Sequence, residues 1–147
     1  MAARPRERPD VEFFAQVDAI GQRAKLRLER ALPSGLSLAG FGVLSHLALW
    51  GGAPGPNELA RALQVTKGAM TNTLQRLESR GFVAVAADTV DARKKRVTLT
   101  PGGRGAYQRA LAAVRPQAEA LRGAFEPVEF EASLPFLRRL RAWLDGA

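Results

Sequence analysis

The spacing of apolar residues changes once along this chain, and that change restricts the fold more than any other feature. Over residues 67–80 the apolar side chains recur every three or four residues, as on one helix face: Met70, Leu74 and Leu77. Gly81 follows, where a helix commonly ends. Residues 82–85 and 96–100 instead read as short β-strands, and the residues between them are mostly polar and charged. The pattern therefore predicts a helix that leads directly into a β-hairpin.

Helical patterns surround this hairpin on both sides. The sequence predicts helices over residues 11–32, 38–50, 57–63, 67–80, 101–122 and 128–144. Asn57 and Thr66 are the expected N-caps of the third and fourth helices. Thr100 and Pro101 provide a cap and a first-turn proline for the fifth, and Pro135 is expected to kink or restart the last. The predicted fold class is mainly α with a small β-hairpin wing (α+β).

The second predicted helix lies in a stretch without charge. No charged residue occurs from Ala31 to Asn57, and residues 36–50 are markedly apolar. A membrane span needs roughly 20 predominantly apolar residues, so this run favours a buried core helix. The first ten residues lack the apolar segment of a secretory signal and read as a flexible arm. We therefore expect a cytoplasmic protein without a membrane partner.

The positive charge of the chain is concentrated in its middle. The net charge is +8, and residues 61–109 alone carry ten basic and three acidic residues. A local excess of this kind is the electrostatic footprint of a nucleic-acid contact, although a solvated basic face gives the same count. A membrane surface is less favoured, because the longest basic run, residues 93–96, continues into a strand pattern instead of an amphipathic helix.

Two short helices followed by a hairpin form a winged helix-turn-helix pattern, and its polar side chains are suited to DNA. A major groove admits a helix, Asn and Gln can read adenine, and Arg can read guanine or hold a phosphate. A basic wing can reach the backbone or a narrow minor groove. The predicted DNA-binding residues are Thr66, Lys67, Thr71, Asn72, Gln75, Arg76, Asp91, Arg93, Lys94 and Lys95.

Several other chemistries are excluded by composition. The chain has no cysteine and one histidine, which excludes disulfides, thiol catalysis, zinc–thiolate sites and multi-histidine metal sites. The basic segment contains no carboxylate pair, phosphate loop or nucleophile with its base, so we expect neither an enzyme nor a bound cofactor or metal. The remaining alternative to a DNA-binding regulator is a winged-helix module that contacts protein or RNA and has no specific operator.

The chain resembles the MarR family of bacterial transcriptional regulators. The resemblance rests on Glu58-Leu-Ala60, Val65-Thr-Lys-Gly-Ala-Met-Thr71, Gly81-Phe-Val83, Asp91-Ala-Arg93, Leu99-Thr100 and Gly103. It implies an obligate homodimer that acts as a repressor on a pseudo-palindromic operator. Residues 67–80 would be the recognition helix, and Arg93 would enter the minor groove, oriented by Asp91. Asn72, Val85 and Ala92 depart from residues common in the family, and Lys94, Lys95 and Arg96 supply positive charge nearby.

The resemblance also implies a domain plan and an effector. Residues 1–10 would be the arm and 11–147 a single domain, with a DNA-binding lobe at about 55–100 and dimerisation helices at about 11–32 and 101–145. Small aromatic or phenolic ligands release many family members from DNA. The expected effector-binding residues are Phe13, Phe14, His46 and Trp50, although aromatic residues at helical spacing also suit a dimer core.

Overall fold

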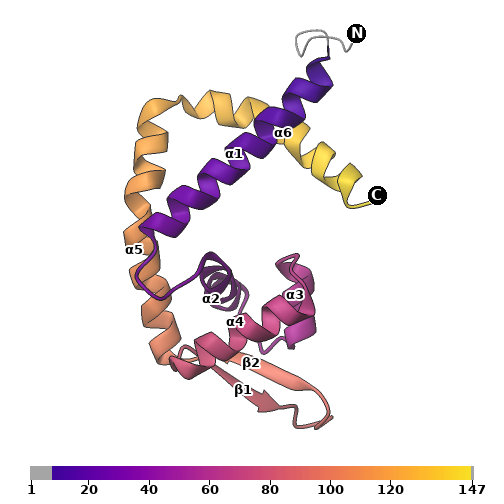
Figure 1. The fold of residues 1–147 in the computed structure, drawn as a ribbon, viewed down its shortest axis with the longest axis vertical. Helices are drawn as coiled ribbons and strands as arrows, with labels where there is room; N and C mark the ends of the chain where they lie inside the picture. Colours follow the sequence, from indigo (N-terminus) through magenta and orange to yellow (C-terminus); the bar gives the residue numbers. More distant parts are fainter. Residues whose placement is uncertain (1–7, 147) are drawn as a thin grey trace. The chain divides into compact units, whose positions relative to one another are not determined.

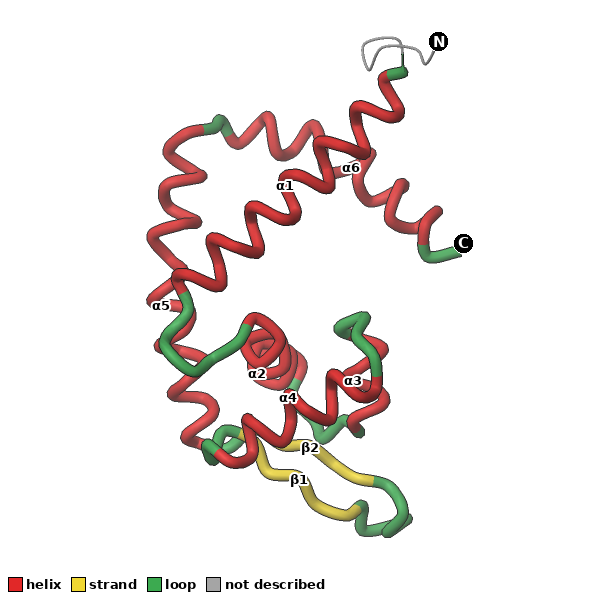
Figure 2. The backbone as a smooth tube through the Cα atoms, in the orientation of Figure 1, coloured by secondary structure: helices red, strands yellow, loops and turns green. Residues whose placement is uncertain are grey.

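The computed structural model describes residues 8–146, in which six helices and one two-stranded sheet follow one another (Figure 1). Their bounds are α1 (Pro9–Ala31), α2 (Leu38–Trp50), α3 (Pro56–Ala62), α4 (Lys67–Ser79), β1 (Val83–Ala87), β2 (Lys95–Leu99), α5 (Pro101–Ala124) and α6 (Pro127–Leu144). Figure 2 shows the helices in red and the hairpin in yellow. The predicted fold class, mainly α with a small β-hairpin, is confirmed.

The contacts divide the chain into two compact units, the first ending at Val114 and the second beginning at Arg115. The first unit contains the helix-turn-helix pattern and the hairpin, and α5 begins in it. The expected single domain over residues 11–147, with its lobe and dimerisation helices, stays a prediction. Of the expected arm, residues 1–7 lie outside the described residues, whereas Pro9 already begins α1.

Several expected boundaries are wrong, at the start of α3 and in the hairpin. Asn57 does not cap α3, because Pro56 occupies the first helical position and Gly55 is the N-cap. Both strands are also displaced by one residue at their starts, since β1 begins at Val83 and β2 at Lys95. The hairpin loop is shorter than expected and comprises residues 88–94, because β1 extends to Ala87 and β2 already begins at Lys95.

Helix α2 supplies the centre of the first unit, as its uncharged sequence predicted. Ser37 caps it by accepting a hydrogen bond from the Gly40 N–H at 3.0 Å. Val43, Leu44 and Leu47 are buried in the core. The last turn is different, because Leu49 and Trp50 are 69% and 78% exposed.

The core of the first unit joins α2 to the helix-turn-helix and the hairpin. Leu59 of α3, Met70 of α4 and Val97 of β2 are almost completely buried in the same cluster. The rings of Phe41 and Tyr107 stack against its edge, with their centroids 6.1 Å apart. Helices α3 and α4 thus each bury one apolar face and leave a polar face exposed.

The start of α5 is fixed against the turn between α4 and β1. The Thr100 hydroxyl donates to the Gly81 carbonyl at 2.5 Å and accepts from the Gly103 N–H at 2.9 Å, so it caps the helix as predicted. A Cβ at Gly103 would overlap the carbonyl oxygen of Phe82. The backbones therefore approach so closely that only glycine fits at this position.

Most side chains of the second unit are exposed to solvent in the single chain. Of its described residues, 115–146, none is buried. The rings of Phe125 and Phe130 meet edge to face, with their centroids 6.1 Å apart. Pro135 does not restart α6, which is one helix from Pro127 to Leu144. Among the described residues, no helix is long and apolar enough to cross a membrane.

Candidate nucleic-acid interface

Helix α4 has one buried and one exposed face. Met70, Leu74 and Leu77 are 2%, 4% and 3% exposed, as their spacing predicted. The other predicted feature, an exposed polar face, is also present: Lys67, Thr71, Asn72, Gln75 and Arg76 are exposed. The helix thus presents amide and guanidinium donors on a rigid support, which is what reading of base edges requires.

The hydroxyls of Thr66, the N-cap of α4, and of Thr71 within the helix differ in what they can still bind. The Thr66 hydroxyl accepts from the Ala69 N–H at 3.1 Å as the N-cap, so its own hydrogen remains able to donate. The Thr71 hydroxyl donates to the Lys67 carbonyl at 2.9 Å. A phosphate oxygen only accepts hydrogen bonds, so Thr71 must rotate away from this carbonyl before it can contact one.

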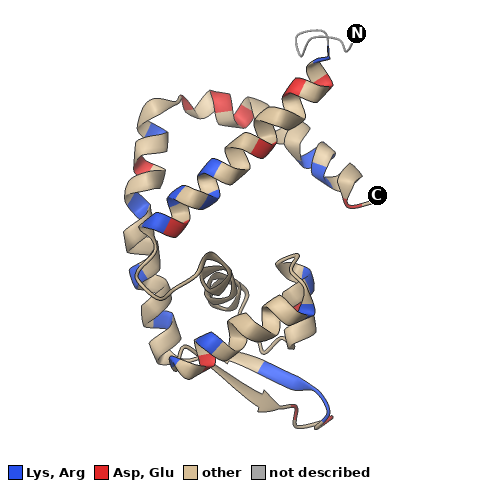
Figure 3. Cartoon of the chain, viewed as in Figure 1, with Lys and Arg blue, Asp and Glu red and all other residues tan. Residues whose placement is uncertain are grey.

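The hairpin follows α4 directly and has a charged and an uncharged strand. Its strands are antiparallel, with Val83 opposite Leu99 and Val85 opposite Val97. Val83 and Val97 are buried in the core, which fixes the face that each strand turns outward. Figure 3 shows basic residues on β2 and on the part of the loop that precedes it, whereas β1 carries no charge.

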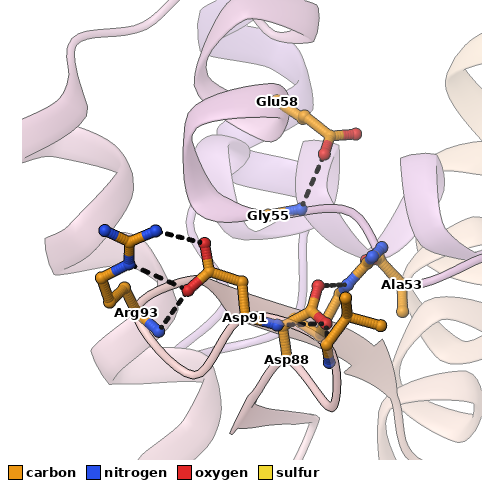
Figure 4. A network of polar contacts seen from close by, with 8 residues as sticks. Ala53, Gly55, Glu58, Asp88, Asp91 and Arg93 are labelled. Atoms are coloured by element: carbon orange, nitrogen blue, oxygen red, sulfur yellow. Dashed lines mark hydrogen bonds and ion pairs between the residues drawn. The ribbon is translucent and has the colours of Figure 1, made fainter.

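The hairpin loop holds the side chain of Arg93 in one orientation. The Asp91 carboxylate accepts from Arg93 Nε at 3.0 Å, from Nη2 at 3.2 Å and from the Arg93 backbone N–H at 3.1 Å (Figure 4). The Arg93 side chain is nonetheless 91% exposed. The hydrogen bond from the Arg93 side chain lowers the pKa of Asp91, and the same bond raises the pKa of Arg93. An ion pair this exposed adds little stability, so its consequence is orientation.

Asp88, at the start of the same loop, is a buried acid that the sequence did not single out as a site residue. It is 8% exposed, and its carboxylate accepts from the Val90 N–H at 2.7 Å and the Asp91 N–H at 3.4 Å. Arg96 Nε donates to the other oxygen at 2.7 Å. The Val90 N–H, and then Arg96, lower the pKa of Asp88. The carboxylate therefore organises the loop from within.

Arg96 joins the wing to the segment that follows α2. Besides its bond to Asp88, it donates from Nη1 to the Ala53 carbonyl at 3.0 Å (Figure 4). The neighbouring Val97 N–H donates to the Pro54 carbonyl at 2.9 Å. Arg96 was expected to contribute positive charge beside Lys94 and Lys95. That charge stays in place, and the structure adds two protein contacts that use Nε and Nη1 while the side chain remains 50% exposed.

A basic cavity of about 450 Å³ lies between α3 and the wing. Arg61, Lys94 and Lys95 line it, and Glu58 also borders it. The Glu58 carboxylate lies 3.5 Å from the Gly55 N–H, across the start of α3 (Figure 4). Arg61 is therefore a basic residue near the wing that the sequence analysis missed, because its position depends on how α3 packs beside β2.

The expected effector residues lie on α1 and α2. Phe13 and Phe14 meet edge to face on α1, with centroids 5.6 Å apart, and Phe14 is 48% exposed. His46 is half-buried on α2, and Trp50 is exposed at its end. None of these four lines the basic cavity or two smaller ones. Their role in effector binding stays a prediction.

The comparison with known sequences agrees with this geometry. Residues 34–94, which include α2, the helix-turn-helix, β1 and the wing loop, match the model of the MarR family. The HTH-type transcriptional repressor Rv2887 of Mycobacterium tuberculosis is 41% identical over 85 residues. This match covers 56% of the present chain and 59% of the relative, so the chain spans less than two thirds of the length of the curated relatives it matches.

Solved structures extend the likeness over nearly the whole chain. A mutant MarR of Escherichia coli complexed with operator DNA has a TM-score of 0.81 at 24% identity, and covers 95% of this chain and 99% of its own. BpsR of Bordetella bronchiseptica has a TM-score of 0.77 at 26% identity, with 88% and 98% covered. The α4 surface, the wing with its Asp91–Arg93 pair and these similarities together lead to one conclusion: residues 34–94 match the MarR family, and the chain has the fold of the MarR structure.

Proposed function

We propose that this chain is a sequence-specific double-stranded-DNA-binding transcriptional regulator that acts as a homodimeric repressor. The observation that carries the proposal is the pairing of an exposed polar face on α4 with an adjacent wing whose Arg93 is held by Asp91. The repressor assignment is supported by the name of the Mycobacterium tuberculosis relative.

Each part of this surface suits a different part of the duplex. Asn72, Gln75 and Arg76 on α4 would read base edges in the major groove, since their donors and acceptors match those of adenine and guanine. Arg93 would enter the minor groove, where negative potential is greatest. The phosphate contacts would come from Thr66, Lys67, Thr71, Lys94 and Lys95.

The basic cavity adds a further phosphate contact to this proposal. Its lining has a net positive charge, because five basic residues border it, Arg61, Arg93, Lys94, Lys95 and Arg96, against two acidic ones, Glu58 and Asp88. A DNA phosphate beside the wing would neutralise this excess and release counterions, so binding would weaken steeply as salt rises. Arg61 is therefore added to the residues proposed to contact the backbone.

A homodimer would place two such surfaces on one operator. Half-sites related by a two-fold axis are spaced by about one helical turn, roughly 34–36 Å. The dimer would form through apolar side chains of the terminal helices, which are exposed in the single chain: Val11, Phe14, Val17, Ile20, Val128, Phe130, Leu134, Leu137, Trp143 and Leu144. Exposed apolar patches of this kind mark association surfaces.

The DNA-bound state would respond to a small aromatic or phenolic effector bound near Phe13, Phe14, His46 and Trp50. The DNA binding of the similar BpsR is regulated by 6-hydroxynicotinic acid, an aromatic acid. To release DNA, the effector needs only to bind one spacing of the two recognition helices more tightly than the other. The coupling free energy between effector binding and DNA binding is typically about 1–3 kcal/mol. We further propose that the protein works in the cytoplasm of a bacterium and that its role is binding without catalysis.

The first experiment is selection of bound sequences from random duplex DNA by the purified full-length protein, at about 150 mM salt. A two-fold symmetric motif would support the regulator and provide a probe for effector screening. Recovery of no motif, with binding that disappears as salt rises, would reject the specific operator. It would favour instead a winged-helix module that contacts protein or RNA.

A further inference from the structure

We propose that Arg96 and Asp88 are positioning residues for Arg93, which they hold in the orientation needed to read DNA. The inference rests on the proposed DNA-binding function and assigns to Arg96 a role other than phosphate contact. It depends on a continuous series of polar contacts that runs from the segment after α2 to the tip of the wing (Figure 4).

The series begins outside the hairpin. Arg96 Nη1 donates to the carbonyl of Ala53, and Arg96 Nε donates to the Asp88 carboxylate. The two bonds use different nitrogens of one planar guanidinium, so they fix both the position and the rotation of that group. The first residue of the wing loop is thereby tied to the segment between α2 and α3.

The series continues from Asp88 into the loop backbone. The second carboxylate oxygen of Asp88 accepts from the N–H groups of Val90 and Asp91. Two backbone bonds also close the loop, from the Asp88 N–H to the Lys94 carbonyl and from the Lys94 N–H to the Asp91 carbonyl, both at 2.9 Å. The backbone of Asp91 is consequently fixed on both sides.

The last contact is the Asp91–Arg93 pair already described. Arg93 is too exposed to be held by packing, so its orientation depends on Asp91, and the position of Asp91 depends on Asp88. Arg96 is the group that anchors Asp88 to the rest of the unit. A side chain that is already oriented loses less conformational freedom when it binds, which is the benefit that the series provides.

A direct phosphate contact by Arg96 is the competing explanation. The two explanations differ in whether the losses of operator affinity caused by substituting Arg93 and Arg96 multiply in the double variant. We would measure operator affinity for the full-length wild type, Arg93→Ala, Arg96→Gln and the double variant at fixed salt. If Arg96 acts through Arg93, Arg96→Gln weakens binding about tenfold in the wild type and less than about twofold in Arg93→Ala. Losses that multiply would overturn the proposal. Lys95→Gln, a neighbouring exposed cation, is the control whose loss should multiply with that of Arg93→Ala.

Asp88→Asn tests the same proposal at an acidic residue, where the substitution makes the wing more positive, whereas Arg96→Gln makes it less positive. The substitution removes a negative charge from the wing, so electrostatic attraction alone predicts equal or tighter binding to DNA. Loss of the anchor predicts weaker binding to the operator and unchanged or tighter binding to random duplex. Equal or tighter operator binding would therefore overturn the positioning role. Arg96→Lys keeps the charge without the planar pair of donors and should reproduce the loss.

A measurement without DNA separates this inference from the proposed function. Nitrogen-15 relaxation of the Arg93 Nε–H group in the free protein should report an ordered side chain in the wild type and in Lys95→Gln. The order should fall in Arg96→Gln while the thermal melting temperature stays close to that of the wild type. An Arg93 side chain that remains ordered in Arg96→Gln would overturn the inference even if no operator exists. Failure of operator binding alone would reject only the proposed function.

Discussion

The carboxylate of Glu78 accepts a hydrogen bond from the backbone N–H of Val85 at 3.1 Å. This bond joins the last turn of α4 to the first strand of the hairpin, seven residues further along the chain. It is a contact between the two elements that we propose to read the major and minor grooves. Their relative position is thus fixed by a side chain as well as by the shared core.

Removal of this bond should weaken the connection between α4 and the wing. We expect Glu78→Ala to lower the free energy of unfolding by about 1 kcal/mol, because the Val85 N–H loses its protein partner. Glu78→Gln keeps an oxygen that can accept this bond and should lose less. Denaturant unfolding of both variants checks this, and equal losses would show that the charge of Glu78 matters instead of its hydrogen bond.

Arg93→Ala should weaken operator binding at least about tenfold while the dimer stays folded. The Arg93 side chain is 91% exposed, so its removal leaves no cavity and should hardly change the melting temperature. Fluorescence anisotropy at controlled salt measures the affinity. Arg104→Ala removes one positive charge from the exposed start of α5 and serves as the control. An Arg93→Ala dissociation constant equal to that of the wild type would contradict the proposed wing contact.

The wing loop should loosen at low pH. The Val90 N–H and Arg96 lower the pKa of Asp88 below its ordinary value of about 3.9 in a peptide. A carboxyl group with a lowered pKa stabilises the folded state above the unfolded pKa, and that contribution disappears as the pH falls through the folded pKa. The Val90 amide proton shift should therefore titrate with a midpoint below about 3.9.

This titration has its own control in the variant Asp88→Asn. The side chain of asparagine does not ionise, so the pH dependence of the Val90 amide should be absent from it. A midpoint at or above the peptide value in the wild type would show that the carboxylate is not held by these hydrogen bonds in solution.

Gly103→Ala should be strongly destabilising. The added Cβ would overlap the carbonyl oxygen of Phe82, which belongs to backbone that cannot move freely. We expect a loss of about 3 kcal/mol or more in the free energy of unfolding. Gly68→Ala is the matched control, since Gly68 also lies in the first turn of a helix and a Cβ there would have no neighbour within 4 Å. A destabilisation of similar size in both variants would contradict the close approach.

The sequence predicted those features that depend on local spacing. The apolar period over residues 67–80 located α4 and its buried face, and the capping roles of Thr66 and Thr100 followed from residue type. The Asp91–Arg93 pair was also within reach of the sequence, because its members are two residues apart. In each case the groups that interact are close together along the chain.

The features that the sequence did not predict depend on packing between distant segments. Arg96 donates to Ala53 across 43 positions, and no spacing rule distinguishes it from the lysines beside it. The burial of Asp88 was missed for the same reason, since an acid in a polar loop is ordinarily exposed. Gly55, not Asn57, caps α3 because a proline between them already fixes the first turn.

Removal of residues 128–147 should convert the dimer to a monomer. Within the second unit, α6 exposes Val128, Trp143 and Leu144 to 64%, 71% and 60%, which a stable protein would cover with a partner. Light scattering of the truncated chain should therefore give the mass of one chain, with circular dichroism to confirm that helix remains. Leu137→Glu places a charge on the same helix at full length and should also weaken the dimer. A folded dimer of the truncated chain would show that the two copies associate through other helices.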